Sequence, residues 1–242
     1  MRLLQMAVAA PVLSRRFGPT SINWHARQRL AVYPDLGIVY NRIKKNANTT
    51  AVFLLHEIES GKVETEANSP KKAARIDSLS LPQTMALRNH LYFVIVRNPY
   101  SRVLSAFLNQ MGLRPEYRQK YGRFPMDPSG FASFADWLAD GGIKKNAHWN
   151  LQTEQMFLPF EKFDAVIRFE SLKPEMSAML DERGLKVPKG RLDGLYPSDA
   201  PGKKTSADKR IAEFYSPETI NKIGRLYEQD FTALGYSHEF PS

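Results

Sequence analysis

The chain has 242 residues, 43% of them hydrophobic, which suits one large α/β domain. It contains no cysteine, which excludes disulfides, cysteine nucleophiles and thiolate metal sites. Its 34 Lys and Arg residues outnumber its 25 Asp and Glu residues, so the net charge is +9. This charge favours an anionic partner, whether nucleic acid, acidic polysaccharide, membrane or charged nucleotide. The five histidines are scattered without the spacing of a zinc site, so we expect no metal.

Residues 1–35 begin with a mildly apolar run, residues 1–13, that is too short to cross a membrane. No later stretch approaches the 18 apolar residues of a membrane span. The remainder of this segment lacks clear periodicity, so we expect an irregular arm that packs on one domain, residues 36–242.

Residues 38–55 predict a short apolar strand, a polar turn and the first turns of a helix. A helix start offers unpaired backbone N–H groups and the positive end of the helix dipole, so it can bind an anion. Lys45 would add a charge there, and Thr49 and Thr50 would add hydroxyl donors. The turn has no glycine and is therefore not a nucleotide-triphosphate P-loop. The alternative is a solvated loop whose helix is capped by Thr49.

Residues 91–97 form a continuous apolar run that ends in Arg97 and predicts a strand buried in a parallel sheet. Asn98 and Pro99 then predict the cap and first position of a helix that runs to Met111. Arg97 thus lies at the carboxyl end of a strand, where open α/β sheets bind ligands. Ser105 lies two helical turns after Asn98, so it and Arg97 could hold one anion. Ser105 could equally be a small residue at a helix contact.

The remaining elements follow the same alternation of strands and helices. We expect the following, in chain order: a helix over 82–89, a basic aromatic loop over 114–130, a helix over 131–139, a strand over 163–169, a helix over 173–183, a loop over 185–206 and a long helix over 217–234. His148, followed by Trp149 in a basic loop, is a candidate general base beside an aromatic platform, although a buried histidine is as common.

Taken together, these residues resemble the sulfotransferases that use 3′-phosphoadenosine 5′-phosphosulfate (PAPS), and most closely the carbohydrate sulfotransferase branch with its bacterial relatives. The family's 3′-phosphate motif, R-[DN]-P-[FY]-x-R-[LV]-x-S-A-[FY], matches residues 97–107 almost throughout. The family's phosphosulfate loop matches residues 45–50, and its H-W-x-x-Q segment matches residues 148–152. The strand end [RK]-[FY]-E-x-L matches residues 168–172, and the C-terminal motif Y-x-x-D-F-x-x-x-G-Y matches residues 227–236.

The resemblance implies a P-loop-like, three-layer α/β fold whose central, mainly parallel sheet is flanked by helices. It also implies transfer of a sulfuryl group from PAPS to a carbohydrate hydroxyl, without a metal. The implied catalytic residues are Lys45, which neutralises the leaving 5′-phosphate, and His148, the base, with Glu170 as the alternative base. The donor-binding residues that we expect are Lys45, Asn46, Ala47, Asn48, Thr49, Thr50, Arg97, Ser105, Lys204, Thr205 and Ser206.

Two departures from the family pattern qualify these expectations. The phosphosulfate loop has Lys44 and Ala47 where the family usually has proline and glycine, and alanine restricts the backbone there. The chain also shows no membrane anchor like that of the Golgi members, so we expect a soluble, cytoplasmic protein. We further expect that it binds no nucleic acid, and peripheral contact with a membrane stays open. Two rival functions stay open: a P-loop kinase-like phosphotransferase and a non-catalytic polyanion-binding module.

Overall fold

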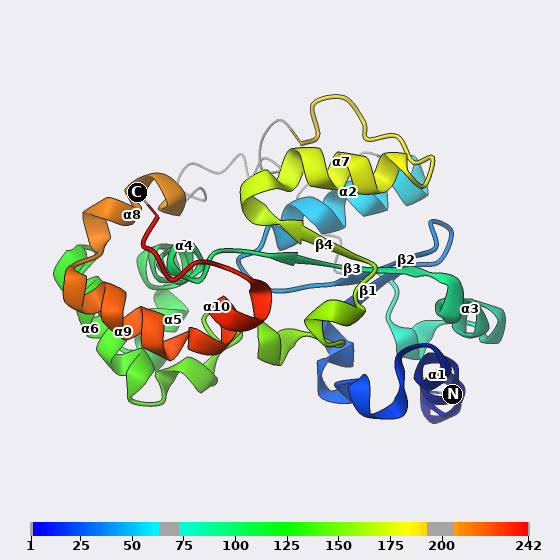
Figure 1. The fold of residues 1–242 in the computed structure, drawn as a ribbon, viewed down its shortest axis with the longest axis horizontal. Coiled ribbons are helices and arrows are strands. Elements are labelled where there is room, and N and C mark those ends of the chain that lie inside the picture. The colour runs from blue at the N-terminus through cyan, green and yellow to red at the C-terminus, as the bar shows by residue number, and fades with distance from the viewer. Residues whose placement is uncertain (1, 63–72, 193–205, 242) are drawn as a thin grey trace. The chain divides into compact units, whose positions relative to one another are not determined.

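A computed structural model describes residues 2–62, 73–192 and 206–241 (Figure 1). The chain forms two compact units. The first unit comprises Met1–Ile43, Ala47–Val96 and Gln155–Tyr196. The second unit comprises Lys44–Asn46, Arg97–Glu154 and Pro197–Ser242. The predicted division into an arm, residues 1–35, and one domain, residues 36–242, stays a prediction.

The first unit is built on a mixed sheet of four strands in the order β1-β2-β3-β4. β1 (Leu30–Tyr33) pairs antiparallel with β2 (Ile38–Asn41). β2, β3 (Leu91–Val96) and β4 (Ala165–Arg168) pair in parallel. The predicted α/β class and mainly parallel sheet are therefore confirmed. The expectation of an irregular arm was wrong at β1, which forms an edge strand of the sheet.

Helices cover both faces of this sheet (Figure 1). Side chains that alternate along the strands, such as Tyr40, Phe93 and Ile95, share a core with α2 (Asn48–Ser60) and α7 (Leu172–Asp181). On the opposite face Tyr92 packs edge-on against Phe17 of α1 (Arg2–Phe17), with ring centroids 4.9 Å apart. α3 (Leu81–Ala86) packs beside α1.

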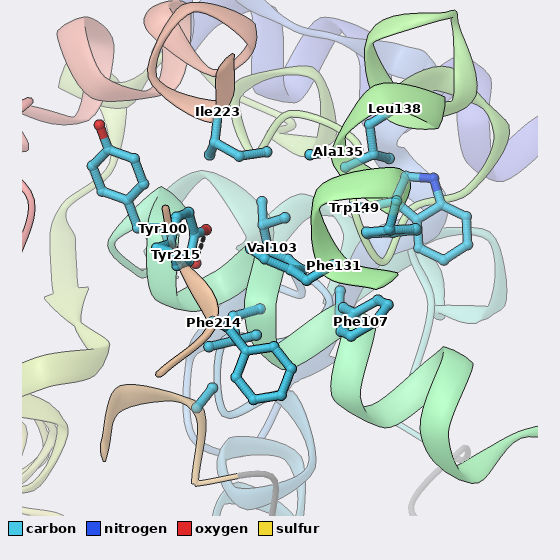
Figure 2. Packing of buried hydrophobic residues seen from close by; sticks show 14 of the residues in the cluster. Tyr100, Val103, Phe107, Phe131, Ala135, Leu138, Trp149, Phe214, Tyr215 and Ile223 are labelled. Carbon is cyan, nitrogen blue, oxygen red and sulfur yellow. Dashed lines mark hydrogen bonds between the residues drawn. The ribbon is translucent and has the colours of Figure 1, made fainter. Parts of the chain in front are cut away.

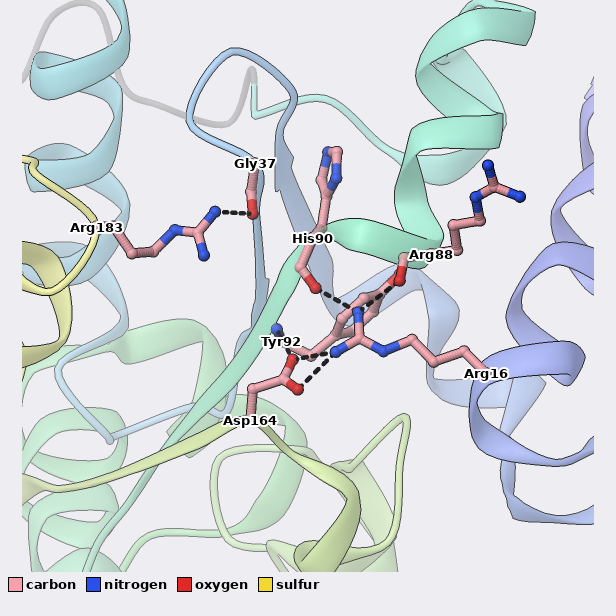
Figure 3. A network of polar contacts seen from close by, with 7 residues as sticks. All are labelled: Arg16, Gly37, Arg88, His90, Tyr92, Asp164 and Arg183. Carbon is pink, nitrogen blue, oxygen red and sulfur yellow. Dashed lines mark hydrogen bonds and ion pairs between the residues drawn. The ribbon is translucent and has the colours of Figure 1, made fainter.

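Arg16, near the end of α1, fastens this helix to the end of the sheet (Figure 3). Its Nη2 lies 2.5 and 2.6 Å from the carboxylate oxygens of Asp164, which in turn accepts a 2.6 Å bond from the backbone N–H of Tyr92. Its Nη1 donates to the backbone oxygens of Arg88 and His90. These contacts hold the carboxyl end of α1 against the sheet of the first unit.

The second unit is helical. Its helices are α4 (Pro99–Ala106), α5 (Pro115–Tyr121), α6 (Pro128–Ala139), α8 (Ala207–Phe214), α9 (Pro217–Leu226) and α10 (Glu228–Leu234). Their apolar faces enclose an aromatic core around Phe107, Phe131 and Trp149 (Figure 2). α4 continues into one π-helical stretch, Phe107–Met111, so the helix predicted to reach Met111 is confirmed in extent.

Two expectations for this unit need correction. Residues 114–130 are not one loop, because α5 lies within them and packs Tyr117 and Tyr121 against the core. The long helix predicted over 217–234 breaks at Tyr227, which has a non-helical φ of −108° and ψ of 17°. The Tyr227 hydroxyl donates to the backbone oxygen of Trp149, so a core contact holds the break in place. Among the described residues, no helix has the length and apolar character needed to cross a membrane.

Candidate functional site

Arg97 stands between the end of β3 and the start of α4, as the sequence predicts. Asn98 caps α4, and its side-chain oxygen accepts from the N–H of Tyr100 at 2.9 Å. Pro99 occupies the first helical position, where a missing N–H costs nothing. This tight turn leaves the Arg97 side chain 4% exposed and fixes it within the second unit.

The Arg97 guanidinium is held by three groups of the second unit. Its Nε donates to Ser101 Oγ at 3.1 Å, and its Nη1 donates to the backbone oxygen of Lys45 at 3.1 Å. Its Nη2 lies 2.8 and 2.6 Å from the two carboxylate oxygens of Asp208. A carboxylate thus binds the arginine that the sequence analysis assigns to the 3′-phosphate of the donor. The site therefore has the chemistry to bind an anion at this point.

Asp208, at the start of α8, was not among the residues predicted from the sequence. Partial burial alone would raise the pKa of the Asp208 carboxyl, but the Arg97 charge and hydrogen bonds from Arg97 and Ser101 outweigh it and lower that pKa. Asp208 remains about half exposed, so solvent and other anions can reach this ion pair.

Ser105 is buried in α4, four residues after Ser101. Residues four apart on a helix lie on the same side, so Ser105 follows Ser101 one turn further along the face that contacts Arg97. This placement leaves both earlier interpretations of Ser105 open: a phosphate ligand or a small residue at a helix contact.

The loop that carries Lys45 has a strained backbone. Lys45 and Ala47 have φ values of 70° and 50°, in the left-handed region that glycine favours. Each costs about 1–2 kcal/mol relative to an ordinary conformation. Ala47 stands where the family usually has glycine, and its φ lies in the region that glycine favours. Strain of this kind clusters at binding sites.

Gln152 ties the Lys45 loop to the Arg97 turn. Its side-chain oxygen accepts from the Arg97 N–H at 3.0 Å and from the Asn46 amide at 2.6 Å, and its amide donates to the Arg97 oxygen at 2.8 Å. Asp230 in turn accepts from the backbone N–H groups of Gln152 and Thr153, at 2.8 and 3.0 Å. The side chain of Asn46, expected to bind the donor, is therefore buried and engaged inside the protein.

Positive charges gather around Lys45. Burial, then the charges of Arg97, Arg102, Arg114 and Lys44, lower the pKa of Lys45 to about 7. The buried Arg102 guanidinium donates to the backbone oxygens of Lys44, Ala147 and Asn150 at 3.1, 3.3 and 2.9 Å. It thereby joins the Lys45 loop to the loop that carries His148. Like charges held together in this way favour a bound anion.

His148 is half-buried beside these charges. Burial, then Lys44, Lys45, Arg102 and Arg114, lower the pKa of its imidazole to about 3, so the ring is neutral at ordinary pH.

Trp149 is not the aromatic platform that the sequence suggested. It is fully buried in the core, and its indole N–H donates to the Gly142 oxygen at 2.9 Å.

The predicted residues that directly follow Asn46 belong to the other unit. Ala47, Asn48, Thr49 and Thr50 belong to the first unit, where α2 begins at Asn48. Ala47 occupies the N-cap position and has no side-chain oxygen to cap the helix, so the capping role weighed for Thr49 was wrong.

Further along the chain, Glu170 is exposed in the first unit. Lys204 and Thr205 lie outside the described residues. Ser206 is exposed, with a φ of 47°, immediately before α8. In the part of the chain that the structure describes, no group of three or more His, Cys, Asp or Glu side chains could hold a metal ion.

Comparison with known proteins decides the family. The sequence model of the sulfotransferase family matches residues 28–237. The chain belongs to the sulfotransferase family. The resemblance predicted from the motifs, Arg97 to Ser105 above all, is thereby confirmed. No solved structure matches the chain significantly.

Two curated relatives are similar to this sulfotransferase. Carbohydrate sulfotransferase 11 of Danio rerio is 27% identical over 198 residues, which cover 71% of this chain and 54% of the relative. Carbohydrate sulfotransferase 11 of Mus musculus is 23% identical over 243 residues, which cover 87% of this chain and 67% of the relative. The chain thus spans about half of the length of the Danio rerio protein.

Proposed function

We propose that this protein transfers a sulfuryl group from PAPS to a hydroxyl of a carbohydrate, with a polysaccharide or glycan as the acceptor. The observation that carries the proposal is the cluster of positive charges around Lys45 and Arg97, where Asp208 already pairs with the arginine. The carbohydrate acceptor is suggested by the names of the two relatives. The proposal includes the P-loop-like, three-layer fold that the resemblance implies. The expected cytoplasmic location stays a prediction, and the proposal does not depend on it.

The residues of the second unit fit a donor that carries several negative charges. The Asp208 carboxylate occupies the position on Arg97 that we assign to the 3′-phosphate of the donor. A guanidinium that binds a carboxylate with two contacts can bind a phosphate in the same way. Ser105 lies one turn beyond Ser101 on the same side of α4 and stays the predicted second ligand of that phosphate. The backbone at the start of α2, with Thr49 and Thr50, stays a prediction for the 5′-phosphosulfate.

The proposed mechanism assigns one task to each side chain. When bound, PAPS supplies a sulfuryl group attached to a 5′-phosphate leaving group. Lys45 neutralises the charge that builds on the leaving oxygen, and such fixed charges are usually the largest contribution to a transfer of this type. Arg97 fixes the donor in position. His148, neutral in the free protein, takes the proton of the acceptor hydroxyl.

A transfer assay tests the proposed function. PAPS is incubated with the protein and a panel of unsulfated polysaccharides and oligosaccharides, and both the adenosine 3′,5′-bisphosphate and the sulfated sugar are quantified. We expect equal amounts of the two products, and a loss of at least 100-fold in kcat for Lys45→Ala, the size typical of removing one such charge-stabilising group. Transfer that survives Lys45→Ala unchanged would contradict the assigned mechanism, and phosphate transfer from ATP would favour the kinase-like alternative.

A further inference from the structure

Asn146 contacts His148 at two atoms. The backbone N–H of His148 donates to Asn146 Oδ1 at 3.0 Å, and the ring Nδ1 lies 2.7 Å from the same oxygen. The Asn146 amide nitrogen donates to the Tyr121 hydroxyl at 3.1 Å. The Tyr117 hydroxyl lies 3.4 Å from Nδ1, a longer and weaker contact. All these residues belong to the second unit.

The backbone contact fixes the orientation of the Asn146 amide. A backbone N–H can only donate, so the side-chain atom that faces it must be the amide oxygen and not the nitrogen. This oxygen can only accept. The Nδ1 atom of His148, 2.7 Å from it, must therefore carry a hydrogen. In a neutral imidazole the other ring nitrogen, Nε2, then holds the free lone pair.

The surroundings of His148 keep the ring neutral and leave Nε2 available. The charged groups that face the ring are Lys44, Lys45, Arg102 and Arg114, all positive, and together with burial they oppose its protonation. Among the described residues, no side chain or backbone group hydrogen-bonds Nε2; both ring contacts are made by Nδ1. The choice of tautomer thus decides which nitrogen can take a proton.

We propose that Asn146 is a positioning residue that holds His148 in the Nδ1–H tautomer, so that Nε2 is the atom that accepts the proton of the acceptor hydroxyl. The catalytic consequence rests on the proposed function, whereas the tautomer does not. In the step, the acceptor oxygen forms a bond to sulfur as its proton passes to Nε2. The bond from sulfur to the 5′-phosphate oxygen breaks, and its electron pair stays on that oxygen beside Lys45. The imidazolium that results keeps its Nδ1–H bond to Asn146 Oδ1, which offsets part of the opposing positive charge around the ring.

Nitrogen NMR of the imidazole tests the tautomer without any substrate. Protein labelled with ¹⁵N in its histidines gives one pair of ring signals per histidine, and His148→Gln identifies the pair of interest. We expect the Nδ1–H form for His148 in the unaltered protein, and a shift towards the Nε2–H form in Asn146→Ala. Asn150→Ala is the matched control, because its side chain contacts Glu154 and Leu151 instead of the ring, and it should leave the tautomer unchanged. An Nε2–H ring in the unaltered protein, or an unaltered tautomer in Asn146→Ala, would overturn the proposal.

Kinetics test the consequence for catalysis. Asn146→Ala should lower kcat by about 10- to 100-fold, the range typical of a metal-ligating histidine that loses the partner orienting it, with little change in the affinity for adenosine 3′,5′-bisphosphate. Asn146→Asp should restore most of kcat, because a carboxylate also accepts from Nδ1–H. A purely structural role would instead lower the thermal midpoint and fail to distinguish the two variants.

The two proposals can fail separately. An unchanged kcat in Asn146→Ala, together with a changed tautomer, would refute the positioning role. An absence of sulfuryl transfer in the unaltered protein would refute the proposed function, while the NMR result would still decide the tautomer.

Discussion

Lys45 is the side chain whose protonation should change most when an anion binds. With a pKa of about 7, it is about half charged at pH 7 in the free protein and about 90% neutral at pH 8. A phosphate beside it favours the charged form and raises the pKa. Binding of adenosine 3′,5′-bisphosphate should therefore take up about half a proton at pH 7 and about 0.9 of a proton at pH 8.

The same linkage fixes how affinity changes with pH. Between pH 7 and pH 9 the charged fraction of Lys45 in the free protein falls from about one half to about one hundredth, so the dissociation constant should rise roughly 50-fold, or about 2.3 kcal/mol. The sign is set by the lysine: binding is tight below its free pKa and weakens as the pH rises above it. The phosphates of the ligand add little in this range, since their last pKa is about 6.

Calorimetric titration measures both quantities. Titrations in two buffers of different ionisation enthalpy give the proton uptake, and a series from pH 7 to pH 9 gives the affinity. Lys45→Arg is the control, because a guanidinium stays charged throughout and should remove the uptake above pH 7. Equal pH dependence in the unaltered protein and in Lys45→Arg would refute the assignment of the lowered pKa to Lys45.

Three further substitutions probe the surroundings of this lysine. Asp208→Asn should tighten adenosine 3′,5′-bisphosphate binding about fivefold in calorimetry, since it removes about 1 kcal/mol of competing ion pair at a half-exposed position; weaker binding would mean that Asp208 supports the ligand. Arg102→Met should lower the free energy of unfolding in urea by about 3 kcal/mol, because three partly buried backbone carbonyl groups lose their donor; a change below about 1 kcal/mol would contradict the role of this arginine as a link between loops. Gln152→Ala should weaken bisphosphate binding about tenfold, since it frees both the Lys45 loop and the Arg97 turn; an unchanged affinity would show that the loops hold their positions without it.

The elements that the sequence predicts well depend on local signals. The cap at Asn98 and the proline at position 99 determine the start of α4 from side chains within the turn itself. The apolar run of β3 is long enough to mark a buried strand. As a result, the place of Arg97 in the fold follows from neighbouring residues alone.

The features that escaped prediction depend on distant partners. Asp208 pairs with Arg97 across 111 positions of sequence, and no local pattern indicates it. The sequence around Trp149 is the same whether the side chain lines a binding site or fills the core, and only its complete burial in the structure distinguishes the two. In α1, by contrast, a signal was present: Ala9, Leu13 and Phe17 are buried at a spacing of four, although Pro11 obscures the helix.

The central claim is that Arg97 recognises a 3′-phosphate, and one comparison tests it most directly. Adenosine 3′,5′-bisphosphate and 5′-AMP are titrated calorimetrically into the unaltered protein, Arg97→Ala and Arg123→Ala, the last being an exposed arginine of the same unit. We expect the bisphosphate to bind at least tenfold more tightly than 5′-AMP in the unaltered protein and in Arg123→Ala, and this difference to disappear in Arg97→Ala. Equal binding of the two nucleotides by the unaltered protein, or a difference that survives Arg97→Ala, would contradict the claim.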